Sequence, residues 1–264
     1  MLDPYFHLVF GGLASIPMII IEDLVRRFGT FTAVGGISLR VNKGEVLGFL
    51  GPNGAGKSTT MRMITGFLAP SEGRITVCGH DVVEQQFEAQ SQIGYLPEGA
   101  PAYPDMTPIQ FLNFIARVRG LKDTAAVNAI ERAVARTGLH AVMEQRIETL
   151  SKGFKRRVGL AQAILHDPPV LIMDEPTDGL DPNQKQSVRG LIKSMSANKA
   201  IIISTHILEE VDAVCSRAVI IDKGRIVADG TPAELLAKSP TKRLDDVFRA
   251  LTTPDAEINA EATS

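Results

Sequence analysis

The sequence predicts an α/β fold built around a mainly parallel sheet. Continuous apolar runs at residues 46–50, 170–173, 200–204 and 218–221 are typical of strands that are buried on both faces of such a sheet. Helical segments separate most of these runs, and strands that alternate with helices favour a parallel arrangement. A glycine-rich segment, residues 51–58, follows the first run directly and leads into a helical pattern.

A small antiparallel β subdomain is predicted before this sheet. Residues 19–24 and 37–41 are β-rich runs, and Gly29, Gly35 and Gly36 lie between them. Two such runs across a short connection that contains glycine indicate a pair of antiparallel strands. The parallel sheet therefore begins only at the third β run of the chain.

A helical insertion is predicted within the sheet. Thr107 is a favoured N-cap, Pro108 suits the first helical position, and Gln110 completes a capping-box pattern. The helical character continues to residue 165. The apolar residues of the first helix recur at helical spacing, and we expect them to pack in a core: Phe111, Phe114, Ile115 and Val118.

The last part of the chain is predicted to form a hairpin, a short helix and a tail. Residues 222–225 form a turn between two β runs, and Thr231 with Pro232 begins another helix. Residues 253–264 are polar, and we expect them to be disordered.

Length and composition favour one domain with short appendages. We expect an N-terminal extension at residues 1–17, a domain at residues 18–235 with the insertion at about 100–165, and a C-terminal tail at residues 236–264. The extension is either an upstream or translation-start segment or a docking segment, and the sequence leaves both open. We expect no apolar stretch to cross a bilayer, because Asp3, Pro4 and Pro17 interrupt the only candidate, residues 5–21, so a membrane role requires a separate partner chain.

Charge and cysteine content exclude some classes of function. A net charge of -2 and a pI near 6.2 argue against a protein that grips nucleic acid through its phosphates. Cys78 and Cys215 lie far apart in the sequence, and we expect both to be free structural thiols in a reducing cytoplasm.

A complete G-x-x-x-x-G-K-[ST] pattern is the strongest local signal. It follows a predicted strand and precedes a helix, as a phosphate-binding loop must. Backbone N–H groups and the helix N-terminus attract phosphates, the lysine adds a full positive charge, and the serine hydroxyl is placed to ligate Mg²⁺. The pattern predicts a P-loop NTPase core that binds ATP with these residues: Gly51, Pro52, Asn53, Gly54, Ala55, Gly56, Lys57, Ser58 and the adjoining Thr59.

Two adjacent carboxylates follow the strand predicted at residues 170–173. Ligands bind at strand ends in α/β sheets. We expect Asp174 to hold Mg²⁺ through water and Glu175 to polarise the water that attacks the γ-phosphate. A solvated acidic turn is the alternative, and the phosphate loop on an earlier strand argues against it.

The segment from Leu150 to Phe154 resembles the signature motif of the ATP-binding cassette (ABC) family. The familiar form is L-S-G-G-Q, and this chain departs from it at Lys152 and Phe154. Ser151 is a good helix N-cap. The resemblance implies that Ser151 and Gly153 bind the nucleotide of a second ATP-binding subunit, expected to be another copy of this chain.

Weaker sequence motifs extend the resemblance to the ABC family over roughly residues 18–231. The segment that ends at Asp181 is similar to the D-loop of the family, and His206 after an apolar strand is similar to its switch histidine. Phe28 stands where the family stacks an aromatic ring on adenine. Glu98 replaces the commoner glutamine, as in a branch that serves ABC-2-type exporters and gliding or copper-site maturation systems. We expect Glu98 to lie near Mg²⁺ and to sense nucleotide.

The resemblance implies the ATP-hydrolysing subunit of a transporter. Two such subunits would clamp two ATP molecules head to tail and drive integral membrane permease subunits, from the cytoplasmic face of the inner membrane. We expect the partner to dock near residues 98–107, where Pro97, Pro101 and Pro104 shape a loop.

Two other classes of function remain for comparison. A role in nucleic-acid maintenance or translation is disfavoured because the chain has neither a long heptad-bearing insertion nor a second cassette. A regulator that binds nucleotide without turnover conflicts with the presence of Lys57, Asp174, Glu175 and His206.

Overall fold

The computed structural model describes residues 17–99, 102–239, 241 and 243–252. The predicted N-terminal extension, apart from Pro17, and the predicted disordered tail at residues 253–264 therefore lie outside the described residues. Pro101 of the expected docking loop also lies outside them.

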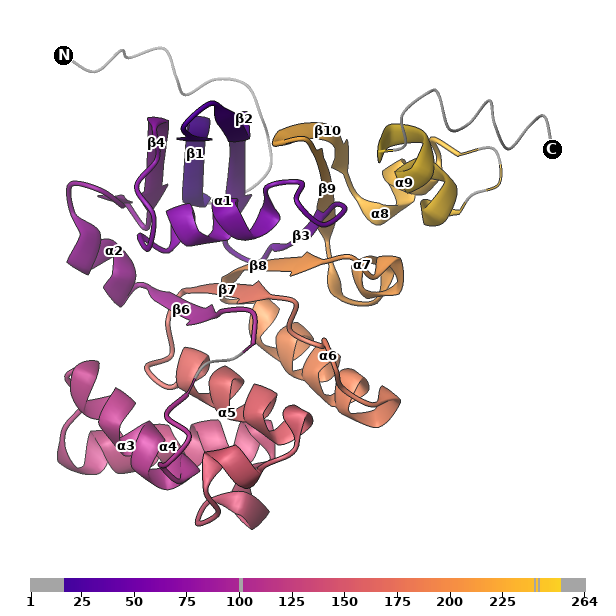
Figure 1. Ribbon diagram of the computed structural model, residues 1–264. Helices are drawn as coiled ribbons and strands as arrows, with labels where there is room; N and C mark the ends of the chain where they lie inside the picture. Colours follow the sequence, from indigo (N-terminus) through magenta and orange to yellow (C-terminus); the bar gives the residue numbers. More distant parts are fainter. Residues whose placement is uncertain (1–16, 100–101, 240, 242, 253–264) are drawn as a thin grey trace.

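A six-stranded sheet with the order β10-β9-β3-β8-β7-β6 forms the centre of the molecule (Figure 1). Neighbouring strands run parallel except for the antiparallel pair β9 and β10. The mainly parallel α/β sheet is thus confirmed, with one strand, β6, that the sequence analysis did not identify. The strands are β3 (Val46–Leu50), β6 (Ile93–Leu96), β7 (Val170–Asp174), β8 (Ala200–Thr205), β9 (Arg217–Asp222) and β10 (Arg225–Gly230).

A second, antiparallel sheet has the order β2-β1-β4-β5. Its strands are β1 (Pro17–Phe28), β2 (Phe31–Asn42), β4 (Glu72–Val77) and β5 (His80–Asp81). The predicted pairing of the first two strands is confirmed. Helix α1 (Lys57–Ile64) lies between the two sheets in Figure 1, and its Met61, Met63 and Ile64 are fully buried in a core shared by both.

The helical insertion forms a separate lobe below the parallel sheet in Figure 1. Thr107 and Gln110 form the predicted capping box. Phe111 is buried, but Phe114 is 39% and Val118 is 65% exposed, so the expectation that they pack in the core was wrong. The apolar stripe of this helix is wider than its buried face. The elements of the lobe are α3 (Pro108–Val118), α4 (Asp123–Thr137), the 3₁₀ turns η1 (His140–Val142) and η2 (Ile147–Thr149), and α5 (Lys152–Ile164).

The remaining helices surround the sheet. They are α2 (Gln86–Ser91), α6 (Pro182–Ser196), α7 (Leu208–Val214), α8 (Pro232–Leu236) and α9 (Leu244–Thr252). The segment assigned to the tail thus contains α9, whose Leu244 and Val247 are buried in a cluster with Leu50 and Ile220. No helix in the described part of the chain has the length and apolarity needed to cross a membrane. Both cysteines are free, as expected.

Candidate functional site

The loop between β3 and α1 can only be built with glycine at two of its positions. A Cβ on Gly51 would lie 2.4 Å from the Ile221 carbonyl oxygen, and one on Gly56 would lie 2.6 Å from the Ala33 carbonyl oxygen. Gly56 also has a φ of 103°, which favours glycine. Neighbouring backbone therefore holds this loop tightly at both ends, and the loop feeds directly into the N-terminus of α1.

Lys57 is the first residue of α1 and is buried. Its Nζ donates hydrogen bonds to the carbonyl oxygens of Gly51 (2.6 Å) and Pro52 (3.0 Å) in its own loop. Burial lowers the pKa of Lys57, and the negative charges of Glu175, Asp174 and Glu98 oppose that effect. The same three carboxylates also interact with the Arg156 guanidinium, and together they still exceed Lys57 and Arg156 by one negative charge, so the site favours an additional cation.

Parallel pairing of β7 with β8 brings Asp174 opposite Ser204. Asp174 is 3% exposed, and its Oδ1 accepts a hydrogen bond from the Ser204 hydroxyl. The next residue, Glu175, has a φ of 49°, a left-handed conformation that costs a non-glycine residue about 1–2 kcal/mol. Its backbone N–H donates to the Ser204 Oγ at 3.1 Å. The end of β7 is therefore a fixed, strained turn.

Glu175 and His206 lie in direct contact. The Oε1 of Glu175 is 2.9 Å from the Nδ1 of His206, which follows the end of β8. Glu175 is 19% and His206 is 50% exposed at the side chain, so the pair is open on the histidine side. A histidine in this position orients the carboxylate, which matches the arrangement expected for a general base.

A cavity of about 430 Å³ joins the phosphate loop to these groups. It includes most of the residues predicted to contact nucleotide, whereas Asp174 is buried and does not line it. The predicted Gly51, Pro52 and Ala55 shape the loop without lining the cavity. The lining residues are Phe28, Phe31, Ala33, Asn53, Gly54, Gly56, Lys57, Ser58, Thr59, Glu98 and Glu175.

Two phenylalanines, Phe28 and Phe31, line the same cavity as the phosphate loop. Phe28, predicted to contact adenine, is 47% exposed, and the guanidinium carbon of Arg26 lies 4.5 Å from the centre of its ring. Phe31 pairs with Phe28 across the β1–β2 turn and is 62% exposed. Phe31 was not predicted from the sequence, although its position directly after a hairpin turn could have placed it opposite Phe28. Exposed rings at the mouth of a cavity can stack on a planar base.

The predicted signature and D-loop residues have local partners and do not line the cavity. Ser151 is the N-cap of α5 and accepts a hydrogen bond from the Phe154 N–H, as expected. Asp181 is likewise the N-cap of α6. A Cβ on Gly153 would lie 2.4 Å from the Gln184 Oε1, the end of a flexible side chain on α6 that can move away. These residues stand apart from the phosphate loop of their own chain.

Lys152, in the predicted signature motif, forms an ion pair with Asp178, in the predicted D-loop. Its Nζ lies 2.9 Å from the Asp178 Oδ2, and this hydrogen bond is the main cause of a lowered Asp178 pKa. Both side chains are largely exposed, so the pair contributes little to stability.

Arg156 is a residue of the site that sequence reasoning missed. It is 6% exposed, and its guanidinium donates to the backbone carbonyls of Asp174 and of Pro97, the residue before Glu98. From the sequence alone, Arg156 was interpreted only as part of a basic helix. Nothing in the local pattern distinguishes it from the neighbouring Arg157, because burial depends on which face of α5 meets the sheet.

Comparison with known proteins gives a consistent picture. A family model described as ABC transporter matches residues 34–178, more than half of the chain. The chain is 35% identical over 226 residues to the Nod factor export ATP-binding protein I of Ralstonia nicotianae, covering 85% of this chain and 70% of the relative. It is 37% identical to the linearmycin resistance ATP-binding protein LnrL of Bacillus subtilis, covering 82% of this chain and 70% of the relative. A solved structure described as the ATP-binding subunit of an ABC transporter superposes with a TM-score of 0.80 at 28% identity, covering 89% of this chain and 99% of that one.

Proposed function

The chain belongs to the ABC transporter family as an ATP-binding subunit that hydrolyses ATP, and on this premise we propose how its residues act and what they drive. The observation that carries the proposal is the shared cavity. The phosphate loop, Lys57 and Glu175 all line it, so a nucleotide phosphate held by the loop lies beside the candidate base.

Each side chain then has a role in phosphoryl transfer. The loop N–H groups and Lys57 bind the β- and γ-phosphates. Glu175 accepts the proton of the attacking water, and His206 orients the Glu175 carboxylate from 2.9 Å. Phe28 supports the adenine ring by stacking. Lys57 donates to its own loop carbonyls here, so phosphate binding exchanges neutral acceptors for charged phosphate oxygens.

The donor set fits Mg²⁺. This ion prefers oxygen ligands and usually takes one or two carboxylates together with water and substrate phosphates. Ser58 supplies a hydroxyl at the cavity wall, Glu98 lines the same cavity, and Asp174 supplies a buried carboxylate whose charge acts on Lys57. We assign the ion to Ser58 and Asp174, with Glu98 near it. When bound, it neutralises charge on the phosphates during transfer.

The signature residues point to a dimer. Ser151, Gly153 and Asp181 do not line the cavity of their own chain. A phosphate-binding helix end is useful only where a phosphate reaches it, and a head-to-tail pair of copies brings the N-terminus of α5 to the other copy's nucleotide. Each ATP then lies between the phosphate loop of one copy and the signature of the other.

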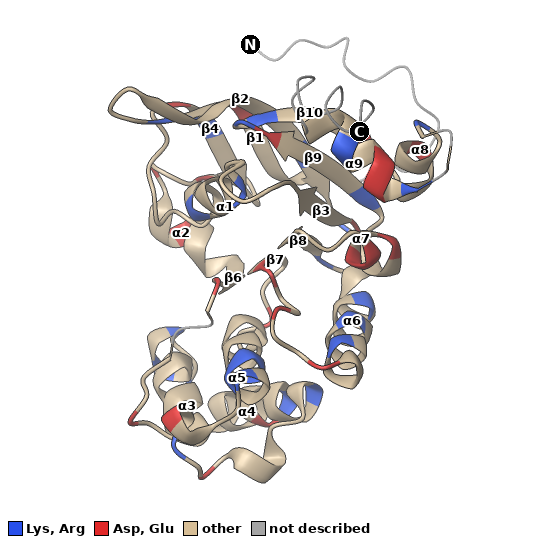
Figure 2. Ribbon diagram, turned by 45° about the vertical axis from the view of Figure 1, so that its right-hand side comes forward, with Lys and Arg blue, Asp and Glu red and all other residues tan. Residues whose placement is uncertain are grey.

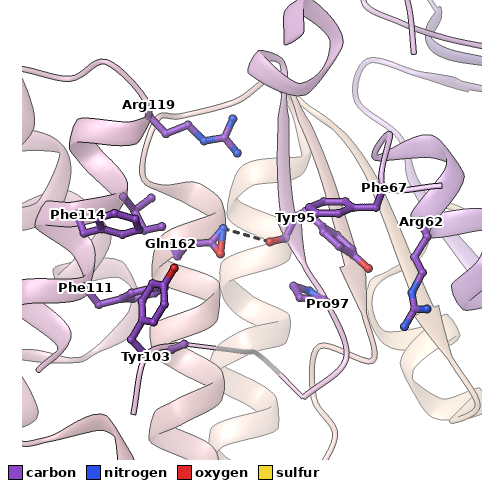
Figure 3. A pocket seen from close by; sticks show the side chains of 11 residues that line it. Arg62, Phe67, Tyr95, Pro97, Tyr103, Phe111, Phe114, Arg119 and Gln162 are labelled. Atoms are coloured by element: carbon purple, nitrogen blue, oxygen red, sulfur yellow. Dashed lines mark hydrogen bonds between the residues drawn. The ribbon is translucent and has the colours of Figure 1, made fainter. Parts of the chain in front are cut away.

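The membrane partner is assigned to an aromatic groove between the two lobes. Its volume is about 740 Å³, and Figure 3 shows Tyr103, Phe111 and Phe114 on one side, facing Tyr95 and Phe67 on the other. Phe67 is 70%, Tyr103 52% and Phe114 39% exposed around this one groove, and a contiguous group of exposed aromatic residues is typical of an interaction site.

The groove suits a short segment of a permease subunit that carries apolar side chains. Gln162 of α5 donates to the Tyr95 carbonyl at 3.3 Å, so the floor of the groove joins the lobes (Figure 3). The groove begins at Pro97, next to Glu98, and a partner seated there contacts the loop that enters the nucleotide cavity. Through such a permease the chain is peripheral to the cytoplasmic face of the inner membrane.

An ABC-2-type exporter is the proposed kind of transporter. Two observations support it: Glu98 stands in place of the commoner glutamine, and one relative is an export protein by name.

Crosslinking to a reconstituted permease tests the docking proposal. Cysteine at Tyr103 should crosslink to the membrane subunit, whereas cysteine at the exposed Val227 of β10, the matched control, should not. The native thiols interfere little, because burial raises the pKa of Cys215 to about 12 and also raises that of Cys78. If cysteine at residue 227 crosslinks to the membrane subunit and cysteine at residue 103 does not, the permease does not dock in the aromatic groove.

A further inference from the structure

One buried guanidinium joins three parts of the molecule. Arg156 lies in the second turn of α5, the helix that the signature residue Ser151 caps. Its Nη1 donates to the Pro97 carbonyl oxygen at 3.0 Å, and its Nε donates to the Pro176 carbonyl oxygen at 3.4 Å. Its Nη2 donates to the carbonyl oxygens of Asp174 and Glu175.

These bonds converge on the strained turn that carries the candidate base. The carbonyls of Asp174, Glu175 and Pro176 are consecutive in the chain, and all of them accept from Arg156. Glu175 between them has a φ of 49°, a conformation that persists only where the surroundings hold it. A planar guanidinium can donate in several fixed directions at once, which a lysine ammonium on a flexible stem cannot reproduce.

The hydrogen bond from Arg156 to the Pro97 carbonyl connects the guanidinium to the loop at Glu98, which also lines the nucleotide cavity. Pro97 immediately precedes Glu98 and lines the aromatic groove as well. Figure 2 shows acidic residues after β6 and β7, with basic residues on α5 below them. A movement of α5 therefore displaces one guanidinium that is bonded to the backbone on both sides of the cavity.

We propose that Arg156 is a positioning residue that sets the backbone of Glu175 and couples it to α5 and to the loop at Glu98. This inference rests on the proposed role of Glu175 as the base. Arg156 touches no reacting atom and acts through the turn that it holds. A change of position in the helical lobe, caused by the second copy or by the membrane partner, thereby reaches the catalytic carboxylate.

Arg156→Lys and Arg156→Met test the proposal, with Arg157→Lys and Arg157→Met as matched controls. Arg157 is the next residue on the same helix, and its guanidinium carbon lies 5.4 Å from the centre of the Phe154 ring. In single-turnover hydrolysis we expect the Arg156 variants to be about 10- to 100-fold slower, because a small misplacement of a catalytic group can cost about 10²-fold. ATP affinity by calorimetry should stay within about threefold.

A purely structural role predicts a different pattern. If Arg156 only stabilises the fold, the variants lose thermal stability and ATP affinity together, or keep the parental rate once folded, and either result overturns the proposal. Arg156→Lys retains the charge and part of the bonding, so it remains a test if Arg156→Met fails to fold.

A double-mutant cycle with Glu175→Gln decides whether Arg156 acts through the base. If it does, Arg156→Lys should lower the residual rate of Glu175→Gln by less than about threefold. A second loss of about 10- to 100-fold in that background would refute the positioning role. Parental hydrolysis by Glu175→Gln alone would instead refute the proposed function, so the two failures are distinguishable.

Discussion

Replacing Glu175 with glutamine removes the base and leaves its surroundings intact. The two side chains have nearly the same shape, and the bonds that hold this turn run from Ser204 and Arg156 to its backbone. What disappears is one negative charge, 2.9 Å from His206 Nδ1. The change therefore separates proton transfer from the binding of ATP, which depends on the phosphate loop and Lys57.

The expected magnitude follows from the role of a general base. Such a group contributes about 10²- to 10⁴-fold to a rate, which corresponds to about 2.7–5.4 kcal/mol of barrier. We expect Glu175→Gln to lose at least about 10²-fold in single-turnover hydrolysis, to keep parental ATP affinity, and to hold its ATP-bound dimer longer. The exposed Glu209 on α7 supplies a control, Glu209→Gln, that should hydrolyse at the parental rate. Hydrolysis by Glu175→Gln at the parental rate would show that another group accepts the proton.

Three further predictions test the phosphate loop, the sensing loop and the fold. Lys57→Ala should weaken ATP binding itself, because its charge acts in both the ground and the transition state, and equal calorimetric affinities would contradict the P-loop assignment. Glu98→Gln should leave ATP affinity nearly unchanged but alter stimulation of the ATPase by the reconstituted permease, and Glu98→Ala should abolish that stimulation. If the permease stimulates the parent protein, Glu98→Gln and Glu98→Ala equally, Glu98 is only a solvated loop residue. Burial lowers the pKa of His166 to about 4, so the unfolded chain, with a pKa of about 6.5, binds the proton first as pH falls. The free energy of unfolding should then decrease between about pH 6.5 and 4 by at most about 1.4 kcal/mol per pH unit, and thermal melts of His166→Gln should lack part of this dependence.

The parallel core and the phosphate loop could be predicted because their signals are local. The strand at Val46–Leu50 is apolar throughout and is followed at once by a complete motif, so sequence and structure agree to the residue. The caps at Thr107, Ser151 and Thr231 were also readable, since each uses a side chain and an N–H three residues apart.

Elements that depend on distant partners could not be predicted in the same way. Strands β4 and β5 follow α1 in the chain but return to the N-terminal sheet, where β4 pairs with β1. Helix α9 has apolar residues at helical spacing, Leu244, Val247, Phe248 and Leu251, a signal that was not used in assigning the tail. Only the fold shows that the cluster around Leu50 covers this apolar face. The exposure of Phe114 similarly depends on how the two lobes meet, because periodicity marks an apolar face but not what covers it.

The candidate site shows the same division. Lys57, Glu175 and His206 were predicted from motifs and strand order, and the structure brings all three together. Arg156 could not be assigned, because its partners are backbone carbonyls that carry no sequence signal. A residue that acts on the main chain is visible only when the fold is known.

The central claim is that each ATP lies between the phosphate loop of one copy and the signature of another. Mixing two inactive variants tests it directly. Lys57→Ala damages the phosphate loop, while Ser151→Asp keeps an N-cap on α5 and places a negative charge where a phosphate should bind. A mixed dimer contains one composite site with both parts intact. The account predicts that the mixture regains ATP hydrolysis that neither variant shows alone, and a mixture as inactive as its components would contradict it.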